Sequence, residues 1–464
     1  MDGAACLRRR AAGTRRARLT IVSAGAPAAL DSPARVGSTS AMLQSAKRLF
    51  LLLVLSLPLM KLSATISGLE ANASDLLFLP CAGVLALAVL TGRTRLRWHP
   101  FYAILIVYFL AMLASALVSP EPARAAVKLV ASAYLLGLAV LACQLIDGEE
   151  DLRRLFRWWL AASALVATVG VVTVLLFAAG IRGPLLHYGL HEYGTLAPGR
   201  YPRIEATFEY PALLCNYLTV SLMLLLVSRH RGWIRGRSFW PLLAGIAVTA
   251  AFSLTPGLGG FLLAVGLWSW LLLRDRFRGG AAMLFAGGVA AASLFLVAAS
   301  VTPILHPTAP FLIDVPGTDV RLAPSVRMMT WLDAGQAFLA HPWLGLGLGM
   351  PPAHVFYIGP AGAHHLQTDA HNVFLNLAAQ SGLVGLAALL LLIGAVVRET
   401  LPLRLTMTGS LALGLGLAWL NAFAYQGLTG SYEDARHLWV LLGLFLAAAR
   451  LRRESAPRGV APQG

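Results

Sequence analysis

The chain is built around a series of apolar stretches, each about as long as a lipid bilayer is thick. A helix needs about 20 apolar residues to cross the hydrocarbon core. The stretches are expected at 49–66, 74–91, 101–118, 126–146, 156–179, 211–228, 239–254, 258–273, 281–300, 372–397, 404–425 and 437–450. They predict an all-α, polytopic integral membrane protein with about 12 transmembrane helices. Only Thr255-Pro256-Gly257 separates two short stretches, so one broken hairpin is the alternative there.

Composition excludes a soluble domain. Of the residues, 58% are hydrophobic and 12% are charged, whereas a soluble domain has about 25% charged residues. The formal net charge of +16 would also suit nucleic acid. However, the arginines form short clusters between apolar stretches, which is the pattern of the positive-inside rule. The expected partner is therefore the lipid bilayer and no nucleic acid.

The basic clusters also give the orientation, because they fall in every second loop. The basic loops contain Lys47, Arg48, Arg93, Arg95, Arg97, Arg153, Arg154, Arg157, Arg229, Arg231, Arg235, Arg237, Arg274, Arg276, Arg278, Arg398, Arg404, Arg450, Arg452 and Arg453. Short loops rich in lysine and arginine stay in the cytoplasm. Both termini are therefore expected in the cytoplasm, and an even number of spans agrees.

The two ends of the chain are predicted to be tails. Residues 1–46 are rich in Ala, Arg, Ser and Pro, which predicts a disordered basic cytoplasmic tail. No apolar segment closely follows the run Arg8-Arg9-Arg10, so a targeting signal is the weaker interpretation. Met42 is an alternative start. The transmembrane domain is expected over 47–451, followed by a second cytoplasmic tail over 452–464.

One long polar loop, about 301–370, is expected on the outer face. Loops that long and structureless are uncommon and usually functional. The ionisable residues that it and its end carry include Asp314, Asp319, Arg321, Arg327, Asp333, His341, His354, His364, His365 and His371. The inner loops are too short for a nucleotide-binding domain and contain no phosphate-binding motif, which argues against ATP-driven transport. The four cysteines lack CxxC spacing, so neither a disulfide nor a metal site is expected.

The first candidate is the segment Pro202-Arg203-Ile204-Glu205-Ala206-Thr207-Phe208, at the outer end of the sixth stretch. A guanidinium at the headgroup level offers a rigid fork of donors that suits pyrophosphate oxygens. The alternative is that Arg203 only anchors the chain at the interface or pairs with Glu205.

The second candidate is Arg327 with Trp331, one turn apart if this piece is helical. Pro342 then ends the helix, and the alternating Gly345, Gly347 and Gly349 would allow a backbone with exposed N–H groups. The alternative is an amphipathic surface helix followed by a glycine turn.

The third candidate is Asp369-Ala370-His371-Asn372, at the start of the tenth stretch. A histidine with an ordinary pKa of about 6.5 suits a general base near neutral pH. A carboxylate could orient its ring, from Asp369 or from elsewhere. The alternative is that Asp369 only caps the helix.

Two further clusters are weaker. Adjacent His364 and His365 point apart and have no further ligand at metal-binding spacing, so no metal is expected. Ionisable residues also crowd Tyr432-Glu433-Asp434-Ala435-Arg436-His437, just before the last stretch. The alternative there is local ion pairing of little energy.

In order, these motifs resemble the O-antigen ligase and polymerase superfamily of membrane glycan enzymes. The resemblance covers about 195–445, including the loop at about 301–370. It rests on the segment from Arg203 to Phe208 with Pro211, on the Ser325-x-Arg327 motif with Trp331 and the His341-Pro342 turn, on His371-Asn372 with the Gly382-x-x-Gly385 pair, and on Arg436 with Trp439.

The resemblance implies a glycosyltransferase in the bacterial inner membrane that serves cell-surface polysaccharide assembly. It implies an undecaprenyl-pyrophosphate-linked glycan as donor, and lipid A-core or another lipid-linked glycan as acceptor, on the periplasmic face. No cofactor and no metal are implied. By position, Arg203 and Arg327 would bind pyrophosphate and His371 would be the base. Glu205, Asp369, Asn372 and Asp434 would support them.

The chain departs from the family pattern at two places. Thr255-Pro256-Gly257 stands where Ser-Arg-Gly is common, so Arg321 or Arg436 would have to supply the missing cation. Pro211-Ala212 replaces a common Pro-Asn pair. A transporter or flippase of lipid-linked glycans is the main rival. It would need ionisable residues near the middle of the spans, and Lys61, Asp75 and Lys128 are the few candidates. A membrane scaffold is the third hypothesis.

Overall fold

The computed structural model describes residues 33–66, 69–191, 202–304, 313–314, 321–358, 364–406 and 409–455. It is mainly helical, and each expected apolar stretch overlaps a helix. These helices are α1 (Pro33–Ser56), α2 (Ala73–Leu90), α3 (Phe101–Leu117), α4 (Pro122–Leu145), α5 (Glu149–Ala178), α7 (Pro211–His230), α8 (Gly236–Ala251), α9 (Leu258–Leu273), α10 (Arg278–Ser300), α12 (Val373–Thr400), α13 (Ser410–Trp419) and α14 (Arg436–Ser455). Of the predicted tails at 1–46 and 452–464, residues 1–32 and 456–464 lie outside the described residues, as does Asp319. Residues 33–46 belong to helix α1 and 452–455 to helix α14.

The protein is a multi-pass membrane protein. Within the described residues, seven helices are long and apolar enough to span a bilayer. They are α2, α4, α5, α7, α10, α12 and the continuous run Ser410–Leu428, in which α13 passes into a π-helix (Leu420–Tyr425) and a 3₁₀ turn (Gln426–Leu428). Helices α3 and α9 are apolar but shorter. The count of twelve spans stays a prediction.

Two boundaries are informative. The prediction of one apolar helix over 49–66 is wrong, because α1 ends at Ser56 and Leu57 precedes a proline, which disfavours helical backbone. The chain then forms a hairpin of β1 (Ser63–Ile66) and β2 (Leu69–Asn72). Helices α8 and α9 are separate elements, joined by the turn that contains Pro256.

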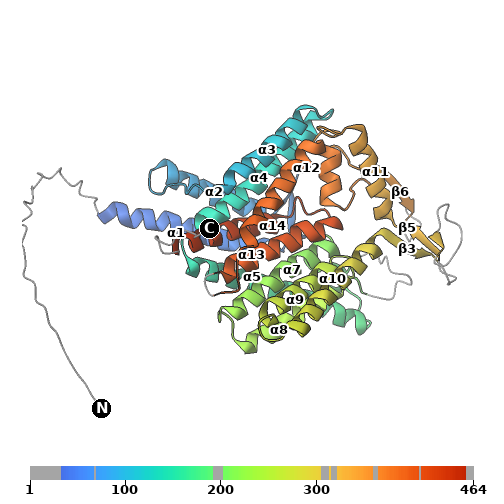
Figure 1. Cartoon of the computed structure of the whole chain (residues 1–464). Helices are drawn as coiled ribbons and strands as arrows, with labels where there is room; N and C mark the ends of the chain where they lie inside the picture. Colours follow the sequence, from blue (N-terminus) through green and yellow to red (C-terminus); the bar gives the residue numbers. More distant parts are fainter. Residues whose placement is uncertain are drawn as a thin grey trace, which may run out of the picture.

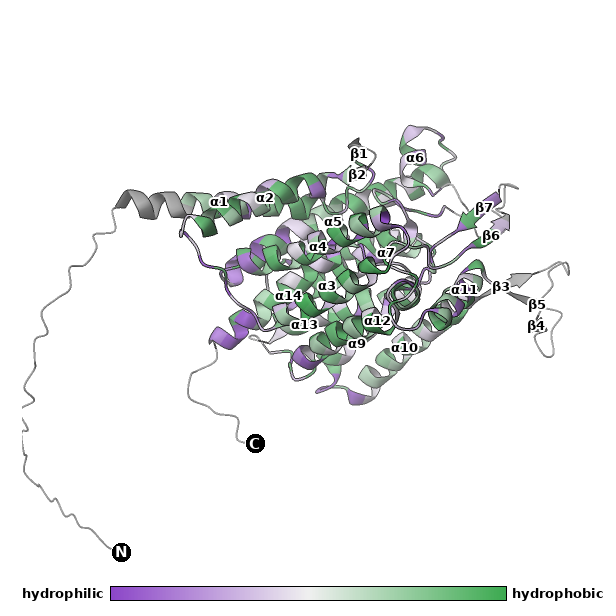
Figure 2. Cartoon of the chain, turned by 90° about the horizontal axis from the view of Figure 1, so that it is seen from above, coloured by the Kyte–Doolittle hydropathy of each residue, from purple (hydrophilic) through white to green (hydrophobic). Residues whose placement is uncertain are grey.

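Helices α7 and α14 form the centre of the domain, with other helices around them (Figure 1). Their side chains are buried on nearly all sides, as expected for helices that are hydrophobic all round. Hydrophobic residues run along the helices, and hydrophilic residues gather toward their ends (Figure 2).

The loops predicted to be cytoplasmic meet at one end of the domain. Lys47 Nζ lies 2.6 Å from both Asp147 and Asp151, at the start of α5. Arg97 also pairs with Asp147, and Arg453 lies 2.5 Å from Glu399. The other loops meet at the opposite end, called the outer end below. The alternation of basic loops with loops poor in lysine and arginine is therefore consistent with the packing of the helices.

The prediction of a structureless outer loop is wrong. Between α10 and α12 the chain forms a small sheet of β3 (Val301–Ile304), β4 (Ile313–Asp314) and β5 (Arg321–Pro324) in the order β3-β5-β4. Helix α11 (Val326–Ala340) and a hairpin of β6 (Val355–Ile358) and β7 (His364–Gln367) follow. In Figure 1 these elements lie together beside one end of the helices. Small sheets therefore join an otherwise helical fold.

The glycine turn after α11 forms backbone hydrogen bonds with α12 at a break in that helix. Gly382 interrupts α12 with a φ of 60°. There the N–H groups of Leu346 and Gly347 donate to the carbonyls of Ala379 and Gln380, at 2.8 and 3.1 Å. The N–H of Leu383 donates in turn to Pro342, at 2.7 Å. The prediction that this turn exposes its N–H groups is therefore wrong, because α12 carbonyls accept them.

Replacing Gly382 with alanine should destabilise the protein by about 3 kcal/mol or more, through left-handed backbone strain and overpacking. A Cβ there would lie 2.3 Å from the backbone of Trp343. Gly394→Ala is the matched control in the same helix, because nothing lies within 4 Å of its Cβ position. Thermal unfolding in detergent should show a large loss for the first variant and none for the second. Equal unfolding temperatures would contradict this account of the break.

Candidate functional site

Backbone hydrogen bonds to three neighbouring segments fix the loop around Arg203. The N–H of His191 donates to the carbonyl of Arg203 at 2.8 Å, and that of Ile204 donates to Phe252, just after α8, at 2.9 Å. The hydroxyl of Thr207 donates to the carbonyl of Pro58, after α1, at 2.6 Å. Loop 202–210 is thus anchored at the outer end and not free in solvent.

Glu205 supports this loop through other partners than Arg203. Its carboxylate binds Lys61 Nζ at 2.7 Å and His191 Nδ1 at 2.5 Å, and the residue is buried. Among the described residues, Glu205 therefore does not form the ion pair with Arg203 that the sequence offered as an alternative. The Nε of Arg203 donates to the carbonyl of Ser253 at 3.4 Å.

Helix α11 carries Arg327 to the same end. Ser325 caps the helix by accepting from the N–H of Met328 at 3.2 Å. On the helix face beyond Arg327, Ala334 packs against Ala370 and Ala379 of the α12 region. The Nε of Arg327 is buried and has no hydrogen-bond partner among the residues that the structure describes. Within the part of the chain that the structure describes, no carboxylate forms an ion pair with it.

His371 lies between the loop and α12, beside Asp369. Its Nδ1 is 3.3 Å from the Oδ1 of Asp369, and its backbone N–H donates to the same oxygen. Asp369 is held in turn by the side chains of Asn376, at 3.0 Å, and Ser431. The ring therefore has a fixed carboxylate on its Nδ1 side.

Arg203, Arg327 and His371 are close enough to shift one another's pKa. Burial lowers the pKa of His371, and the charges of Arg327 and Arg203 lower it further, while Asp369 opposes them. Burial and the charge of Arg327 lower the pKa of Arg203 to about 10, against the charge of Glu205. Burial also lowers the pKa of Arg327. These three side chains, from three distant parts of the sequence, therefore lie within electrostatic reach of one another and make up the candidate site.

Backbone strain is concentrated around these side chains. Among the described residues other than glycine, the three with positive φ are Ala206, Leu254 and His371, each at 49°. Ala206 follows Glu205, and Leu254 follows Ser253, whose carbonyl accepts from Arg203. Such strain costs of order 1–3 kcal/mol per residue and persists mainly at functional sites.

One residue of this site, Asn376, was not among the sequence candidates, and it binds Glu433 of the weaker cluster at 432–437. The side-chain amide of Asn376 donates to Asp369 and, at 2.9 Å, to Glu433. Burial raises the pKa of Glu433, and the charges of Asp434 and Asp369 raise it further. The signal in the sequence was an asparagine inside an apolar stretch, because a polar residue inside a membrane span is usually functional.

Asn372 and Asp434 have structural contacts. The side chain of Asn372 caps α12 by accepting from the N–H groups of Phe374 and Leu375, at 3.0 and 3.1 Å. The alternative that Asp369 caps this helix is therefore wrong. Asp434 lies 2.6 Å from Lys128 of α4.

Arg436 has a partner of its own, away from the three-residue site. It binds Asp75 of α2 with both sides of its fork, at 2.5 and 2.7 Å, and Tyr134 donates to the same carboxylate. Arg321 lies in β5 opposite Ile304 and Asp314, and its side chain lies outside the described residues. Neither is brought to His371 by a described contact.

We expect Arg436→Ala and Asp75→Ala each to lower stability by about 3 kcal/mol, because each leaves a largely buried charge unpaired. The double variant should lose less than the sum of the two. Thermal unfolding of the four proteins in detergent measures this. The pairing account fails if Arg436→Ala abolishes activity at full stability while Asp75→Ala does not, since Arg436 would then act on a substrate.

A comparison with family models decides the relationship. Residues 239–390 match the model described as O-antigen ligase. This region is therefore similar to the O-antigen ligase family, and the match supports that superfamily. The matched O-antigen ligase region runs from α8 into α12 and contains Arg327, Asp369 and His371, while Arg203 lies before it. A search of curated proteins finds no match. The family confirms the resemblance read from the motifs and supports an O-antigen ligase or polymerase type of role in glycan assembly at a membrane.

Proposed function

We propose that this protein is a membrane glycosyltransferase that moves a glycan from undecaprenyl pyrophosphate to an acceptor hydroxyl. The acceptor is lipid A-core or a second lipid-linked glycan. The reaction takes place at the outer end, which the basic loops assign to the periplasmic face of a bacterial inner membrane. Both termini are then cytoplasmic.

The observation that carries the proposal is the grouping of Arg327, Arg203 and His371. An arginine without an ion pair, at the surface of a membrane domain, is suited to bind an anion. Its buried Nε has no hydrogen-bond partner among the described residues, and pyrophosphate oxygens would supply one. A second arginine within electrostatic reach suits a dianionic group.

The chemistry follows from these side chains. The bond between the anomeric carbon and the pyrophosphate oxygen breaks, and a bond from the acceptor oxygen to that carbon forms. Arg203 and Arg327 stabilise the charge on the departing pyrophosphate. His371 takes the acceptor proton, and Asp369 on its Nδ1 side leaves Nε2 to do so. Displacement in one step inverts the anomeric centre.

The transporter hypothesis has less support. Its three candidate residues lie toward the outer end and are paired there. Lys61 follows α1 and binds Glu205, Asp75 lies in the first turn of α2 and binds Arg436, and Lys128 binds Asp434. None of them offers a free charge midway along a span.

The test is glycan transfer by purified protein in detergent, with undecaprenyl-pyrophosphate glycan and either lipid A-core or a second lipid-linked glycan, with and without EDTA. We expect product on one acceptor, unchanged by EDTA. No product on either acceptor from folded protein would contradict the proposal. Movement of intact donor across a vesicle membrane without product would favour the transporter, and full function without Arg203, Arg327 and His371 would favour a scaffold.

A further inference from the structure

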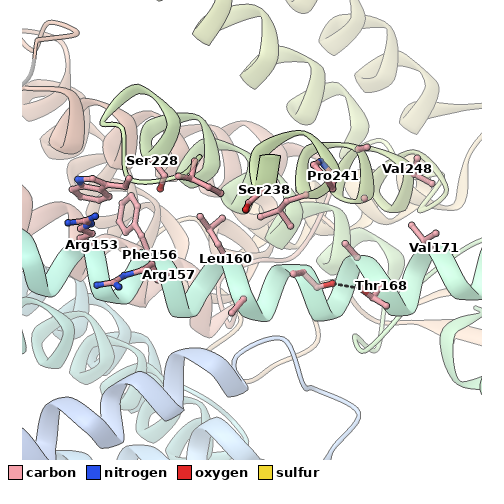
Figure 3. A pocket seen from close by; sticks show the side chains of 18 of the residues that line it. Arg153, Phe156, Arg157, Leu160, Thr168, Val171, Ser228, Ser238, Pro241 and Val248 are labelled. Atoms are coloured by element: carbon pink, nitrogen blue, oxygen red, sulfur yellow. Dashed lines mark hydrogen bonds between the residues drawn. The ribbon is translucent and has the colours of Figure 1, made fainter. Parts of the chain in front are cut away.

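A cavity lies in a groove between α5 and α8, and none of Arg203, Arg327 and His371 lines it. Its volume is about 780 Å³. Figure 3 shows the side chains of Arg153, Phe156, Arg157 and Ser228 toward one end and those of Val171 and Val248 toward the other. Most of the wall between them is aliphatic, and it includes Leu160 and Leu242.

The groove exists because the two helices touch closely only in part of their length. The hydroxyl of Thr249 donates to the carbonyl of Ala167 at 3.2 Å, and a Cβ on Gly170 would lie 2.3 Å from Thr249. Toward the other end, Trp233 packs edge-on against Phe156, with ring centroids 5.5 Å apart. An indole at one end of an apolar groove is typical of a lipid headgroup boundary.

The arginine end of the groove carries excess positive charge. Arg153 and Arg157 share a single exposed carboxylate, that of Glu150, at 3.6 and 3.0 Å. The hydroxyl of Ser228, which lines the groove, is buried and has no hydrogen-bond partner in the part of the chain that the structure describes. A buried hydroxyl without a partner costs free energy, so a ligand oxygen in the groove would stabilise it.

This end is the one where the basic loops meet. Glu149, the first residue of α5, pairs with Arg231 after α7, and Asp151 pairs with Lys47. The positive-inside pattern places these loops at the cytoplasmic leaflet, which has a negative surface potential. The arginine end of the groove therefore lies at the leaflet opposite to the candidate active site.

We propose that this groove binds one anionic glycerophospholipid of the cytoplasmic leaflet. An acyl chain lies along the aliphatic wall between α5 and α8. The phosphate lies between Arg153 and Arg157, and Ser228 donates to an oxygen of the headgroup or ester. Two guanidinium groups with one shared carboxylate favour an anionic lipid over a zwitterionic one of the same chain length. This assignment does not depend on the glycosyltransferase proposal.

The test is native mass spectrometry of the full chain after delipidation, titrated with phosphatidylglycerol or phosphatidylethanolamine that have identical acyl chains. We expect the protein to retain one phosphatidylglycerol about tenfold better than phosphatidylethanolamine. The double variant Arg153→Ala/Arg157→Ala should lose that preference. Arg237→Ala is the matched control, an arginine near the same end that does not line the groove, and it should keep the preference.

A second variant shows whether a loss of lipid binding in the double variant is due only to misfolding. Ala164→Trp fills the groove from an exposed position on α5 without changing any charge, and it should also prevent retention of the lipid. Equal retention of both lipids by the wild type would overturn the proposal. So would undiminished retention in both the double variant and Ala164→Trp. Stronger retention of a polyprenyl phosphate than of phosphatidylglycerol would replace the phospholipid with that lipid.

Discussion

Replacing Arg327 with glutamine is expected to lower glycan transfer about 10²- to 10³-fold, the usual effect of removing one group that stabilises charge in a transition state. Stability should stay the same or rise slightly. Arg327 has no ion pair within the described residues, and its Nε is buried without a partner, so the substitution removes a desolvated charge and breaks no contact. Transfer kinetics and thermal unfolding of the same preparation measure the two effects.

Two variants sharpen this prediction. Arg327→Lys keeps the charge but loses the planar fork, so it should recover only part of the activity. Arg182→Gln is the matched control, because this arginine lies near the outer end of α5 and is exposed. It should transfer glycan at the wild-type rate. An Arg327→Gln variant that is fully active, or that is inactive only because it unfolds, would contradict the assignment.

Replacing His371 with asparagine is expected to lower transfer about 10²- to 10⁴-fold, the contribution of a general base. Asparagine is the substitution of choice, because His371 has a φ of 49° and asparagine tolerates the left-handed region. Loss of activity can then be attributed to the ring and not to the backbone. A folded His371→Asn protein with normal transfer would remove the base from the mechanism.

The pH dependence of transfer tests the grouping of the three side chains. A base must be neutral, so activity is lost as pH falls through its pKa. Burial and the charges of Arg327 and Arg203 lower the pKa of His371, so the acid limb should lie below the ordinary value of about 6.5. Arg327→Gln should move the limb to higher pH, and Asp369→Asn, which removes an opposing negative charge, to lower pH. An acid limb that neither substitution moves would show that His371 does not titrate in this reaction.

Much of the fold could be predicted because the bilayer sets a simple rule of length and apolarity. Every expected stretch overlaps a helix, yet α1 stops ten residues early because Pro58 follows Leu57. The outer loop could not be predicted in the same way. The turn after its helix is held by distant partners, the α12 carbonyls that accept from the N–H groups of Leu346 and Gly347.

The candidate site also has a part that the sequence predicted and a part that it did not. Residue type and order in the sequence pointed to Arg203, Arg327 and His371, but their proximity depends on α11 packing against Ala370 and Ala379. The roles of Asn372 and Arg436 could not be predicted from the sequence, because a helix cap and an ion pair depend on partners in other parts of the fold. The N–H groups of Phe374 and Leu375 define the first, and Asp75 of α2 defines the second.

The most direct test of the central claim separates donor binding from chemistry in one experiment. Single-turnover transfer at rising concentrations of undecaprenyl-pyrophosphate glycan would be measured for the wild type, Arg327→Gln and His371→Asn. We predict that Arg327→Gln needs much more donor to reach half its maximal rate. His371→Asn should bind donor like the wild type, yet have a maximal rate at least about 100-fold lower. The account would be contradicted if His371→Asn reached the wild-type rate, or if Arg327→Gln showed wild-type dependence on donor and an unchanged maximal rate.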